Sequence, residues 1–305
     1  MLNELKKRVP TLMNNYRKFS TIIPSKIFLS WQFKRHLGYE MDWQDPVTFN
    51  QKLQWLKVNW HDSLATQCAD KYEVRNFVSN KTNYSILNEV YGIYDNVHQI
   101  DLKKLPKSFI LKATHSSGMN FVCTDKNKVN WKKKFKEMNL WLSTNYYNGN
   151  REWVYKDIKP RIICEKLLTN ENMDFKSLDD YKFYCFNGVP HYCQVIRGRG
   201  ENETIDFFDM DWNHMPFTGM RPLPNSKEKI LKPFKYEKMI ELSTQLSKDF
   251  PFVRVDFYYV NEEIVFGEMT FFPTSGMGQF YPSKWNTIMG ELLNLNQTKN
   301  EANIK

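Results

Sequence analysis

The amino-acid sequence predicts an α+β fold, in which helices come first and antiparallel strands with helices on one side follow. Three observations support this prediction. Residues 1–68 carry aromatic and aliphatic side chains at helical spacing, two segments further on have the pattern of β-hairpins, and no repeat or Gly/Ser-rich linker interrupts the chain. With 305 residues, the chain is long enough for two domains and for a core that needs no disulfides.

The front of the chain is expected to be helical and basic. Pro46 precedes a helix predicted over 48–58, and Asp70 is a candidate N-cap for the next helix. Residues 1–36 hold eight Lys and Arg against one Glu, so +7 of the net charge of +9 lies there. Such a segment suits an anionic membrane surface or an acidic polymer, and the alternative is a helical pair that packs its apolar side on the protein body.

Other features of the composition exclude several classes of protein. No apolar run approaches the roughly 18 residues of a membrane-spanning helix, and no secretory signal is evident. We therefore expect a cytoplasmic protein, with peripheral contact at the inner face of the cytoplasmic membrane as an option for its basic front segment. The five cysteines show no CxxC and no His at metal-ligand spacing, which favours core thiols. No nucleic-acid-binding motif accompanies the positive charge, and nucleic acid is not an expected partner.

Strands dominate the rest of the chain. We expect strands at 109–114, 121–124 and 161–168, a helix over 131–145, and a second helix over 236–248. A first hairpin joins 181–186 to 189–195 through Asn187-Gly188, the dipeptide preferred in two-residue type I′ turns.

The second hairpin, 253–271, is the most informative part of the sequence. If a three-residue loop at 261–263 joins its strands, Asp256 lies opposite Glu268 and Arg254 lies opposite Thr270. The same register pairs Tyr258 with Phe266 and Val260 with Ile264. Side chains alternate along a strand, so one face is expected to be core, made of Val253, Val255, Phe257, Tyr259, Val265, Met269 and Phe271.

Two opposed carboxylates repel each other unless a cation lies between them. Mg²⁺ prefers oxygen ligands and completes its shell with water and substrate phosphates, so Asp256 and Glu268 are candidate metal ligands. The alternative is a surface hairpin in which Arg254 neutralises Asp256 and Glu268 is solvated. The following segment, 272–278, is rich in small residues whose backbone amides could stabilise an oxyanion.

Two lysines lie inside apolar strands upstream of this hairpin. Lys112 precedes the small-residue loop with Ser116, Ser117 and Gly118, and Lys182 follows in an aromatic strand. A strand, a loop with few Cβ atoms and a lysine are what a flap over polyphosphate needs. Together with the acidic pair, they predict a polyphosphate site.

The order of these motifs resembles the ATP-grasp fold, in the manner of D-alanine–D-alanine ligases. The motifs are Asp70-Lys71, Ile110-Leu111-Lys112 before the Ser-Ser-Gly loop, Cys164-Glu165-Lys166-Leu167-Leu168, Arg254-Val255-Asp256-Phe257 and Gly267-Glu268-Met269-Thr270-Phe271-Phe272-Pro273. The segment 45–55, which leads to Lys71, is similar to the narrower TupA-like ATP-grasp family of bacterial surface-polysaccharide gene clusters. The resemblance covers roughly residues 30–292.

The resemblance implies two α+β lobes with antiparallel sheets that enclose ATP. It implies a basic helical segment at 1–68, a small lobe with flap and hinge at 69–168, and a large lobe at 169–305. The roles that it implies are phosphate contacts from Lys71, Lys112 and Lys182 beside the Ser116, Ser117 and Gly118 flap; adenine contacts from Glu165 and the backbone from Lys166 to Leu168; Mg²⁺ ligation by Asp256 and Glu268; and acyl-group contacts from Arg254 and the turn at Ser275 and Gly276. Thr270 stands where many members have an Asn as a metal ligand.

The activity implied is that of an ATP-dependent carboxylate–amine ligase that forms an acyl phosphate. The family context suggests a uronic acid of a capsular, O-antigen or teichuronic glycan as the carboxylate, and an amino acid or other amine as its partner. A kinase that phosphorylates a sugar hydroxyl is the first alternative, because the sequence does not separate the two acceptors. A basic module that binds an anionic polymer is the second, and a glycosyltransferase lacks a sugar-nucleotide motif.

Overall fold

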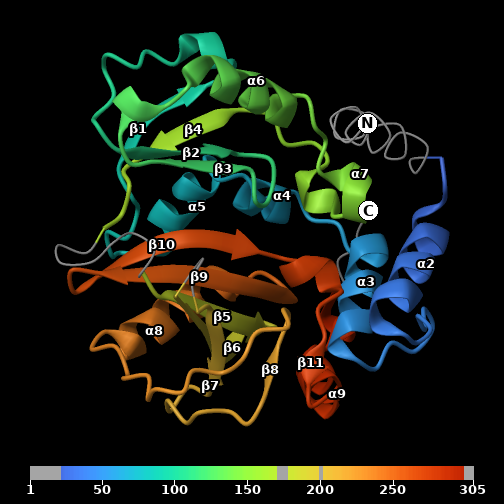
Figure 1. Ribbon diagram of the computed structural model, residues 1–305. Coiled ribbons are helices and arrows are strands. Elements are labelled where there is room, and N and C mark those ends of the chain that lie inside the picture. The colour runs from blue at the N-terminus through green and yellow to red at the C-terminus, as the bar shows by residue number, and fades with distance from the viewer. Residues whose placement is uncertain (1–21, 170–177, 199–201, 299–305) are drawn as a thin grey trace.

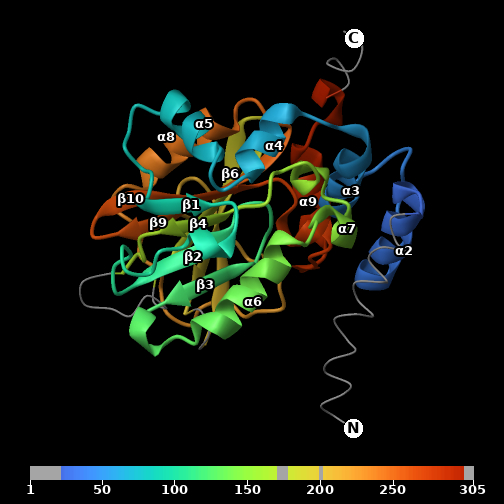
Figure 2. The same cartoon turned by 90° about the horizontal axis from the view of Figure 1, so that it is seen from above.

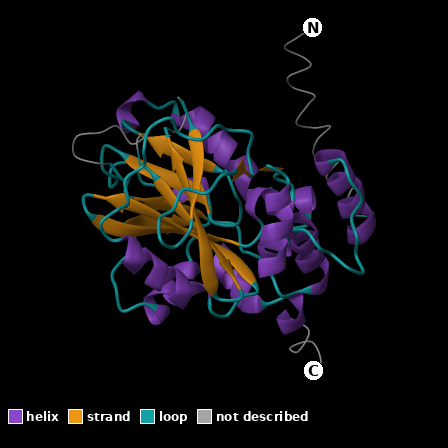
Figure 3. Cartoon of the chain, turned by 90° about the horizontal axis from the view of Figure 1, so that it is seen from below, coloured by secondary structure: helices purple, strands orange, loops and turns teal. Residues whose placement is uncertain are grey.

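The structure of the protein, a computed structural model, describes residues 22–169, 178–198 and 202–298. Two antiparallel sheets face each other, and helices flank both (Figures 1 and 3). Residues of both sheets line a cleft between them. The predicted α+β class is confirmed. A short pair, β8 (Thr218–Gly219) with β11 (Phe280–Tyr281), lies apart from the two main sheets.

The smaller sheet has four strands in the order β1-β4-β2-β3. Its strands are β1 (Val90–Tyr94), β2 (Phe109–Ala113), β3 (Asn120–Cys123) and β4 (Ile162–Glu165). Helix α6 (Trp131–Leu142) packs against β2 on the outer face, as Figure 1 shows. Phe109, Leu111, Met138 and Cys164 are buried in the separate core of this lobe. Strand β1 was not predicted from the sequence.

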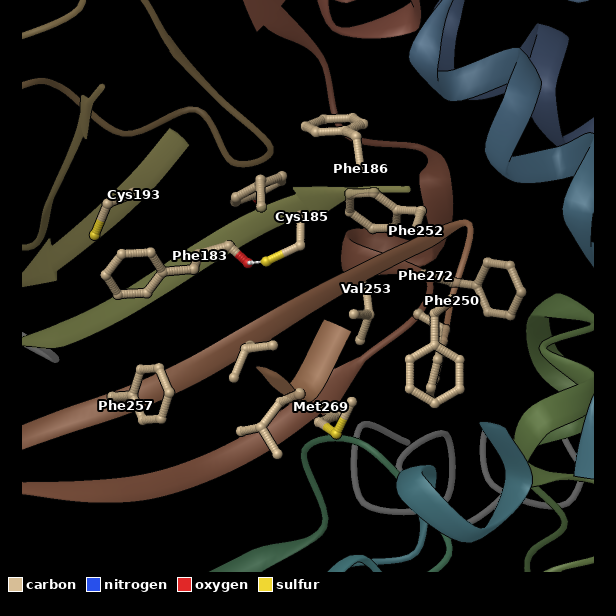
Figure 4. Close-up of a cluster of buried hydrophobic side chains, with 14 of the residues drawn as sticks. Phe183, Cys185, Phe186, Cys193, Phe250, Phe252, Val253, Phe257, Met269 and Phe272 are labelled. Carbon is tan, nitrogen blue, oxygen red and sulfur yellow. Dashed lines mark hydrogen bonds between the residues drawn. The ribbon is translucent and has the colours of Figure 1, made fainter. Parts of the chain in front are cut away.

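The larger sheet has five strands in the order β10-β9-β5-β6-β7. They are β5 (Asp180–Phe186), β6 (Val189–Arg197), β7 (Thr204–Phe208), β9 (Phe252–Val260) and β10 (Glu263–Thr270). Helix α8 (Tyr236–Ser247) packs on β5, β6 and β9. Figure 4 shows the aromatic core of this lobe, in which Phe183, Val253, Phe257 and Met269 are buried together.

The front helices are α2 (Ser25–Leu37), α3 (Phe49–Asn59), α4 (Ser63–Ala69) and α5 (Val74–Lys81). Helices α3, α4 and α5 share their core with the larger sheet, whereas the buried side chains of α2 do not belong to that core. Thr48 caps α3 through a capping box with Gln51, which sets its first residue within one position of the prediction. The ring of Phe49 packs on Phe186 and Phe252 of the sheet. Figure 2 shows α2 and α3 beside α9 (Lys284–Leu292) at one end of the molecule.

Asp70 caps a turn before α5. Its carboxylate accepts hydrogen bonds from the backbone amides of Tyr72 and Glu73, and helix α5 begins at Val74. The predicted boundaries at residues 68 and 168 stay a prediction, although α3, α4 and α5 belong by packing to the core of the larger sheet. The basic stretch 1–21 lies outside the described residues.

The turn of the first hairpin was predicted correctly, whereas that of the second was not. Asn187 and Gly188 have φ of 48° and 82° and join β5 to β6 in a two-residue turn, as predicted. The loop of the second hairpin was predicted with the wrong length. It has only two residues, Asn261 and Glu262, with φ of 49° and 63°, so that Val260 pairs with Glu263.

A β-bulge between Phe266 and Glu268 then restores the predicted pairing of the polar residues. Tyr258 pairs with Val265, whereas Asp256 pairs with Glu268 and Arg254 with Thr270. The bulge turns Ile264 and Phe266 into the core, where the sequence had placed Val265. The extra residue therefore corrects the side-chain alternation between the turn and the acidic pair.

Within the described part of the chain, no helix has the length and apolar character needed to cross a bilayer.

Candidate functional site

A row of charged residues crosses three strands of the larger sheet. Lys182 on β5 pairs in register with Asp256 on β9, and Asp256 pairs with Glu268 on β10. Because neighbours in register point to the same face, the three side chains project together toward the smaller sheet. The acidic pair predicted from the sequence is therefore present on one face.

Two cations hold the carboxylate of Asp256. Nε of Arg254 donates to Oδ1 at 2.7 Å, and one terminal nitrogen of Arg254 donates to Oδ2 at 2.7 Å. Lys182 donates a further hydrogen bond to Oδ2. Asp256 and Lys182 are both buried. The neutralisation by Arg254 that the sequence offered as an alternative is therefore observed, but inside a cleft and with a second cation.

Thr270 links this ion pair to Glu268. Its hydroxyl lies 3.1 Å from Glu268 Oε1, and a terminal nitrogen of Arg254 donates to the Thr270 oxygen at 3.1 Å. Burial alone would raise the pKa of Glu268, but the charges of Lys71, Arg254 and Lys182 lower it to about 2. Glu268 therefore stays ionised at neutral pH.

The donor set at the acidic pair fits Mg²⁺. Asp256 and Glu268 offer carboxylate oxygens on adjacent strands, and Thr270 adds a hydroxyl beside them. Among the residues that the structure describes, no group of three or more His, Cys, Asp or Glu side chains could hold a metal by itself. A metal at this position would thus need oxygens from water and a bound phosphate, which is how Mg²⁺ is commonly held.

Lys71 connects the flap to the acidic pair. Its backbone amide donates to the Thr114 carbonyl at 3.2 Å and its ammonium donates to the Ser116 carbonyl, while Glu268 Oε2 lies 3.9 Å from the same ammonium. Burial lowers the pKa of Lys71, and the charge of Glu268 opposes that effect. Lys71 therefore lies between the flap loop and the candidate metal ligands.

The flap residues differ in their exposure to the cleft. Ser117 and Gly118 line it, and Gly118 has a φ of 77°, a conformation that suits glycine. Ser116 is fully buried and its hydroxyl has no hydrogen-bond partner among the described residues. Of the predicted flap residues, Ser117 and Gly118 thus face the cleft directly.

Lys112 and Glu165 form an ion pair at the other side of the cleft. Nζ of Lys112 lies 2.8 Å from Glu165 Oε2, and a terminal nitrogen of Arg75 lies 3.8 Å from Oε1. The carboxylate of Glu165 thus contacts Lys112 and Arg75. That Glu165 contacts adenine stays a prediction. At the hinge, the Lys166 amide donates to the Glu89 carbonyl at 2.9 Å.

The cleft between the sheets has a volume of about 570 Å³. This lies within the ~300–1,000 Å³ usual for small-molecule sites. Charged residues and apolar residues both line it. The lining consists of Lys71, Asn88, Ile110, Lys112, Ser117, Gly118, Asn120, Val122, Lys166, Leu167, Leu168, Leu178, Lys182, Asp256, Tyr258, Gly267 and Glu268.

Sequence reasoning missed the apolar wall of this cleft. Ile110 pairs with Val122, and Lys112 pairs with Asn120, so these four residues form one face of the β2–β3 hairpin. Strand alternation from Lys112 could have identified them, because Ile110 lies two residues away. Tyr258, two residues beyond Asp256, carried the same signal on β9.

The turn after β10 contains the remaining predicted residues, Ser275 and Gly276. The Ser275 amide donates to the Phe272 carbonyl at 2.8 Å, so this amide already has a partner within the turn. The Ser275 carbonyl and hydroxyl both accept hydrogen bonds from Lys57 at 2.9 Å. The assignment of Ser275 and Gly276 to an oxyanion site stays a prediction.

Several solved structures are similar to this chain at low identity. The D-alanine–D-alanine ligase from Helicobacter pylori is 13% identical, with 80% of this chain and 69% of that chain covered and a TM-score of 0.42. The Bacillus anthracis enzyme of the same name, complexed with ATP, is 13% identical, with 76% and 64% covered and a TM-score of 0.39. The biotin carboxylase domain of Hydrogenobacter thermophilus 2-oxoglutarate carboxylase, in complex with MgADP, is also 13% identical, with 70% and 42% covered and a TM-score of 0.42.

One curated protein matches a short part of the sequence. It is the membrane glycoprotein RL11 of human cytomegalovirus (strain Merlin), 26% identical over 107 residues. The match spans 33% of this chain and 44% of that protein, less than half of its length.

The sequence model of the TupA-like ATP-grasp family matches residues 51–294, which is well over half of the chain. The match includes the flap, the hinge, the charged row on β5, β9 and β10, and the turn at 273–276. The chain therefore belongs to the TupA-like ATP-grasp family, an enzyme family of the ATP-dependent ligase type for which ATP and Mg²⁺ are the typical cofactors.

Proposed function

We propose that this chain is a carboxylate–amine ligase that converts ATP to ADP and phosphate. A carboxylate oxygen of the substrate attacks the γ-phosphorus and ADP leaves. The nitrogen of an amine then attacks the acyl carbon, phosphate leaves, the nitrogen loses a proton, and an amide remains. Phosphate leaves carbon far more readily than a carboxylate oxygen does, which is why the reaction consumes ATP.

One observation carries the proposal: four lysines and two carboxylates meet in a single cleft between two sheets. Lys71, Lys112, Lys166 and Lys182 line it together with Asp256 and Glu268. Fixed cations in a closed site stabilise the charge that moves during phosphoryl transfer. An acidic pair beside them suits a phosphate-bound metal.

Each group of residues in and beside the cleft would have its own role in this reaction. Asp256 and Glu268 would hold Mg²⁺, which neutralises phosphate charge when bound. The apolar wall of Ile110, Val122 and Tyr258 would take the base, and the Ser117-Gly118 flap would cover the phosphates. Arg254, held beside Thr270 at 3.1 Å, would face the acyl group.

The substrate is proposed from the family. We propose a uronic acid, or a similar carboxylate, of a bacterial surface polysaccharide or its sugar-nucleotide precursor, amidated by an amino acid or another amine. The surplus of positive charge, +9 over the chain, suits an acidic substrate of this kind.

The test is to incubate the full chain with MgATP and sugar carboxylates, with and without amines. The expected result is ADP release that requires both the carboxylate and the amine, with an amide product in the mass spectrum. ADP release that needs no amine and yields a phosphosugar would instead establish the kinase. Glucose in place of glucuronic acid is the matched control, because it lacks only the carboxylate.

We also propose that α2 contacts an anionic membrane surface. One side of α2 packs inward through Phe28, Leu29 and Phe33, while Ile27 and Trp31 on the other side are 63% and 50% exposed. The sequence from 22 to 37 carries Lys26, Lys34 and Arg35 and no acidic residue. Exposed apolar side chains flanked by cations suit the interface of an anionic bilayer.

Sedimentation of the full chain with vesicles checks this contact. We expect binding to vesicles that contain phosphatidylglycerol, little binding to pure phosphatidylcholine, and a loss of binding in the Ile27→Ser/Trp31→Ser variant. Leu140→Ser is the matched control, because Leu140 on α6 is 61% exposed and lies outside α2. Equal binding of both variants would show that α2 does not make the contact.

A further inference from the structure

Three polar side chains are buried on one side of α3. Asn50 and Gln54 are fully buried, and Lys57 is 3% exposed. Their spacing, four and then three residues, places them in one row along the helix. Burying an amide or an ammonium is costly unless it is hydrogen-bonded, so each of these groups needs a partner.

Their partners lie in the turn that follows β10. Nδ2 of Asn50 donates to the carbonyls of Gly276 and Gly278 at 2.9 Å each. Nε2 of Gln54 donates to the carbonyls of Ser275 and Gly276 at 3.0 Å each. Lys57 donates to the carbonyl and the hydroxyl of Ser275 at 2.9 Å each. All three side chains thus bind the same short stretch of backbone.

This stretch has an unusual backbone conformation. Thr274, Ser275 and Gly276 are left-handed in succession, with φ of 49°, 55° and 63°. The left-handed region is unfavourable for residues with a side chain, because Cβ comes too close to the following carbonyl oxygen. Such a turn persists only where its surroundings hold it, and the six hydrogen bonds from α3 do so.

The fit between helix and turn is close. A Cβ atom at Gly276 would lie 2.5 Å from Nε2 of Gln54 and 2.9 Å from Cβ of Leu53, so a side chain there would push α3 away. Lys57 also donates to the Asn150 carbonyl at 2.9 Å, and the charge of the buried Glu152 opposes the lowering of the Lys57 pKa by burial. Ser275 is therefore held by a lysine that is itself buried and fixed by a third hydrogen bond.

We infer that Asn50, Gln54 and Lys57, here called the α3 clamp, are positioning residues that hold the turn at 274–276 in place for the acyl-transfer step. This inference rests on the proposed ligase function. The turn follows directly on the strand that ends with Thr270, whose hydroxyl bonds both Arg254 and Glu268. A shift of the turn would move it relative to the acyl group beside Arg254.

The inference also gives α3 a role that packing alone does not explain. The segment 45–55, which contains Asn50 and Gln54, carried the resemblance to the TupA-like family in the sequence. None of the three clamp residues lines the cleft. They act on the turn and not on ATP, so the inference separates turnover from nucleotide binding.

The test compares two lysines of the same helix. Lys57→Met removes two of the clamp's three hydrogen bonds to Ser275. Lys52→Met is the matched control, because Lys52 donates to the carbonyls of Gly290 and Leu293 at 2.7 Å each and does not bond the turn. We measure ADP release from MgATP with the carboxylate and amine that support turnover of the wild type, binding of the non-hydrolysable analogue AMPPNP with Mg²⁺, and hydrogen exchange of the amides at 274–278.

For Lys57→Met we expect turnover to fall about 10²-fold, as for a misplacement of about 1 Å near a reacting group. AMPPNP affinity should stay within about twofold of the wild type, a difference of roughly 0.4 kcal/mol. The amides of the turn should exchange faster than in Lys52→Met. If Lys57 had only a structural role, the two substitutions would have the same effect. Equal turnover and equal amide exchange in Lys57→Met and Lys52→Met would therefore overturn the clamp.

Gln54→Met covers the case in which Lys57→Met does not fold because Glu152 has lost its lysine. It removes two hydrogen bonds to the turn and keeps Lys57, whose positive charge acts on the buried Glu152. Faster turn exchange with unchanged AMPPNP binding is expected here as well, and unchanged exchange would overturn the clamp. Because exchange needs no turnover, a wild type that fails to bind AMPPNP would overturn the proposed function and leave the clamp to be judged by exchange.

Discussion

Replacing Glu268 with Gln is expected to lower turnover about 10³-fold, or roughly 4 kcal/mol of transition-state stabilisation. Gln keeps the size of the side chain and can still accept a hydrogen bond from Thr270, but it lacks the charge that a divalent metal needs. The fold should tolerate the change. The ion pairs of Glu268 with Arg254 and Lys71 are long, at 3.4 Å and 3.9 Å.

The measurement is ADP release at saturating MgATP, together with the Mg²⁺ dependence of AMPPNP binding. Glu263→Gln is the control on the same strand, because Glu263 is exposed and pairs with Lys235 at 2.8 Å outside the cleft. Both variants should stay folded without urea, and Glu268→Gln should unfold at a lower urea concentration than Glu263→Gln because it removes a charge that Lys71, Arg254 and Lys182 stabilise. Wild-type turnover in Glu268→Gln would remove this residue from the proposed metal site.

The pairing of Asp256 with Glu268 could be predicted because the residue pattern of the hairpin is strong. Val253, Val255 and Met269 alternate with polar residues, and a strand with one buried face has little freedom in its register. The sequence therefore placed Arg254, Asp256, Glu268 and Thr270 on one face, and the structure places them there.

The turn of the same hairpin could not be predicted. Asn261 and Glu262 both have positive φ, yet Glu is not a residue that signals a two-residue turn. The predicted loop was one residue too long, and the bulge beside Gly267 offsets that error before the acidic pair is reached. Gly267 was the available signal, since an isolated glycine in a strand often marks a bulge or a close approach. A Cβ there would lie 3.0 Å from the backbone oxygen of Asp256.

The residue types of the site were more predictable than their partners. Lysines inside apolar strands indicated a polyphosphate site, but the pairing of Lys112 with Glu165 depends on how β4 lies beside β2. The contact of α3 with the turn at 274–276 joins segments more than 200 residues apart. Such contacts follow from the packing of whole elements, which local sequence patterns do not specify.

Replacing Asp256 with Asn is expected to lower the free energy of unfolding by roughly 3–5 kcal/mol, the usual cost of removing one partner from a buried ion pair. The side chains of Arg254 and Lys182 are only 11% and 7% exposed, and both donate to this carboxylate. An amide would leave two buried cations with only longer ion pairs, Lys182 with Asp180 at 3.8 Å and Arg254 with Glu268 at 3.4 Å. Turnover should also be lost, which is why Glu268→Gln tests the metal site more cleanly.

Urea unfolding without nucleotide measures this effect. Asp249→Asn is the control, because Asp249 pairs with Lys81 at 2.6 Å where both side chains are about one-third exposed, and its loss should cost about 1 kcal/mol or less. The double variant Lys182→Met/Asp256→Asn should recover part of the stability, since it removes one of the two stranded charges. If Asp256→Asn unfolds like the wild type, Glu268 and Asp180, which lies 3.8 Å from Lys182, must already balance Arg254 and Lys182. Arg254 and Lys182 would then be neutralised by several carboxylates together, and no single carboxylate would determine the free energy of unfolding.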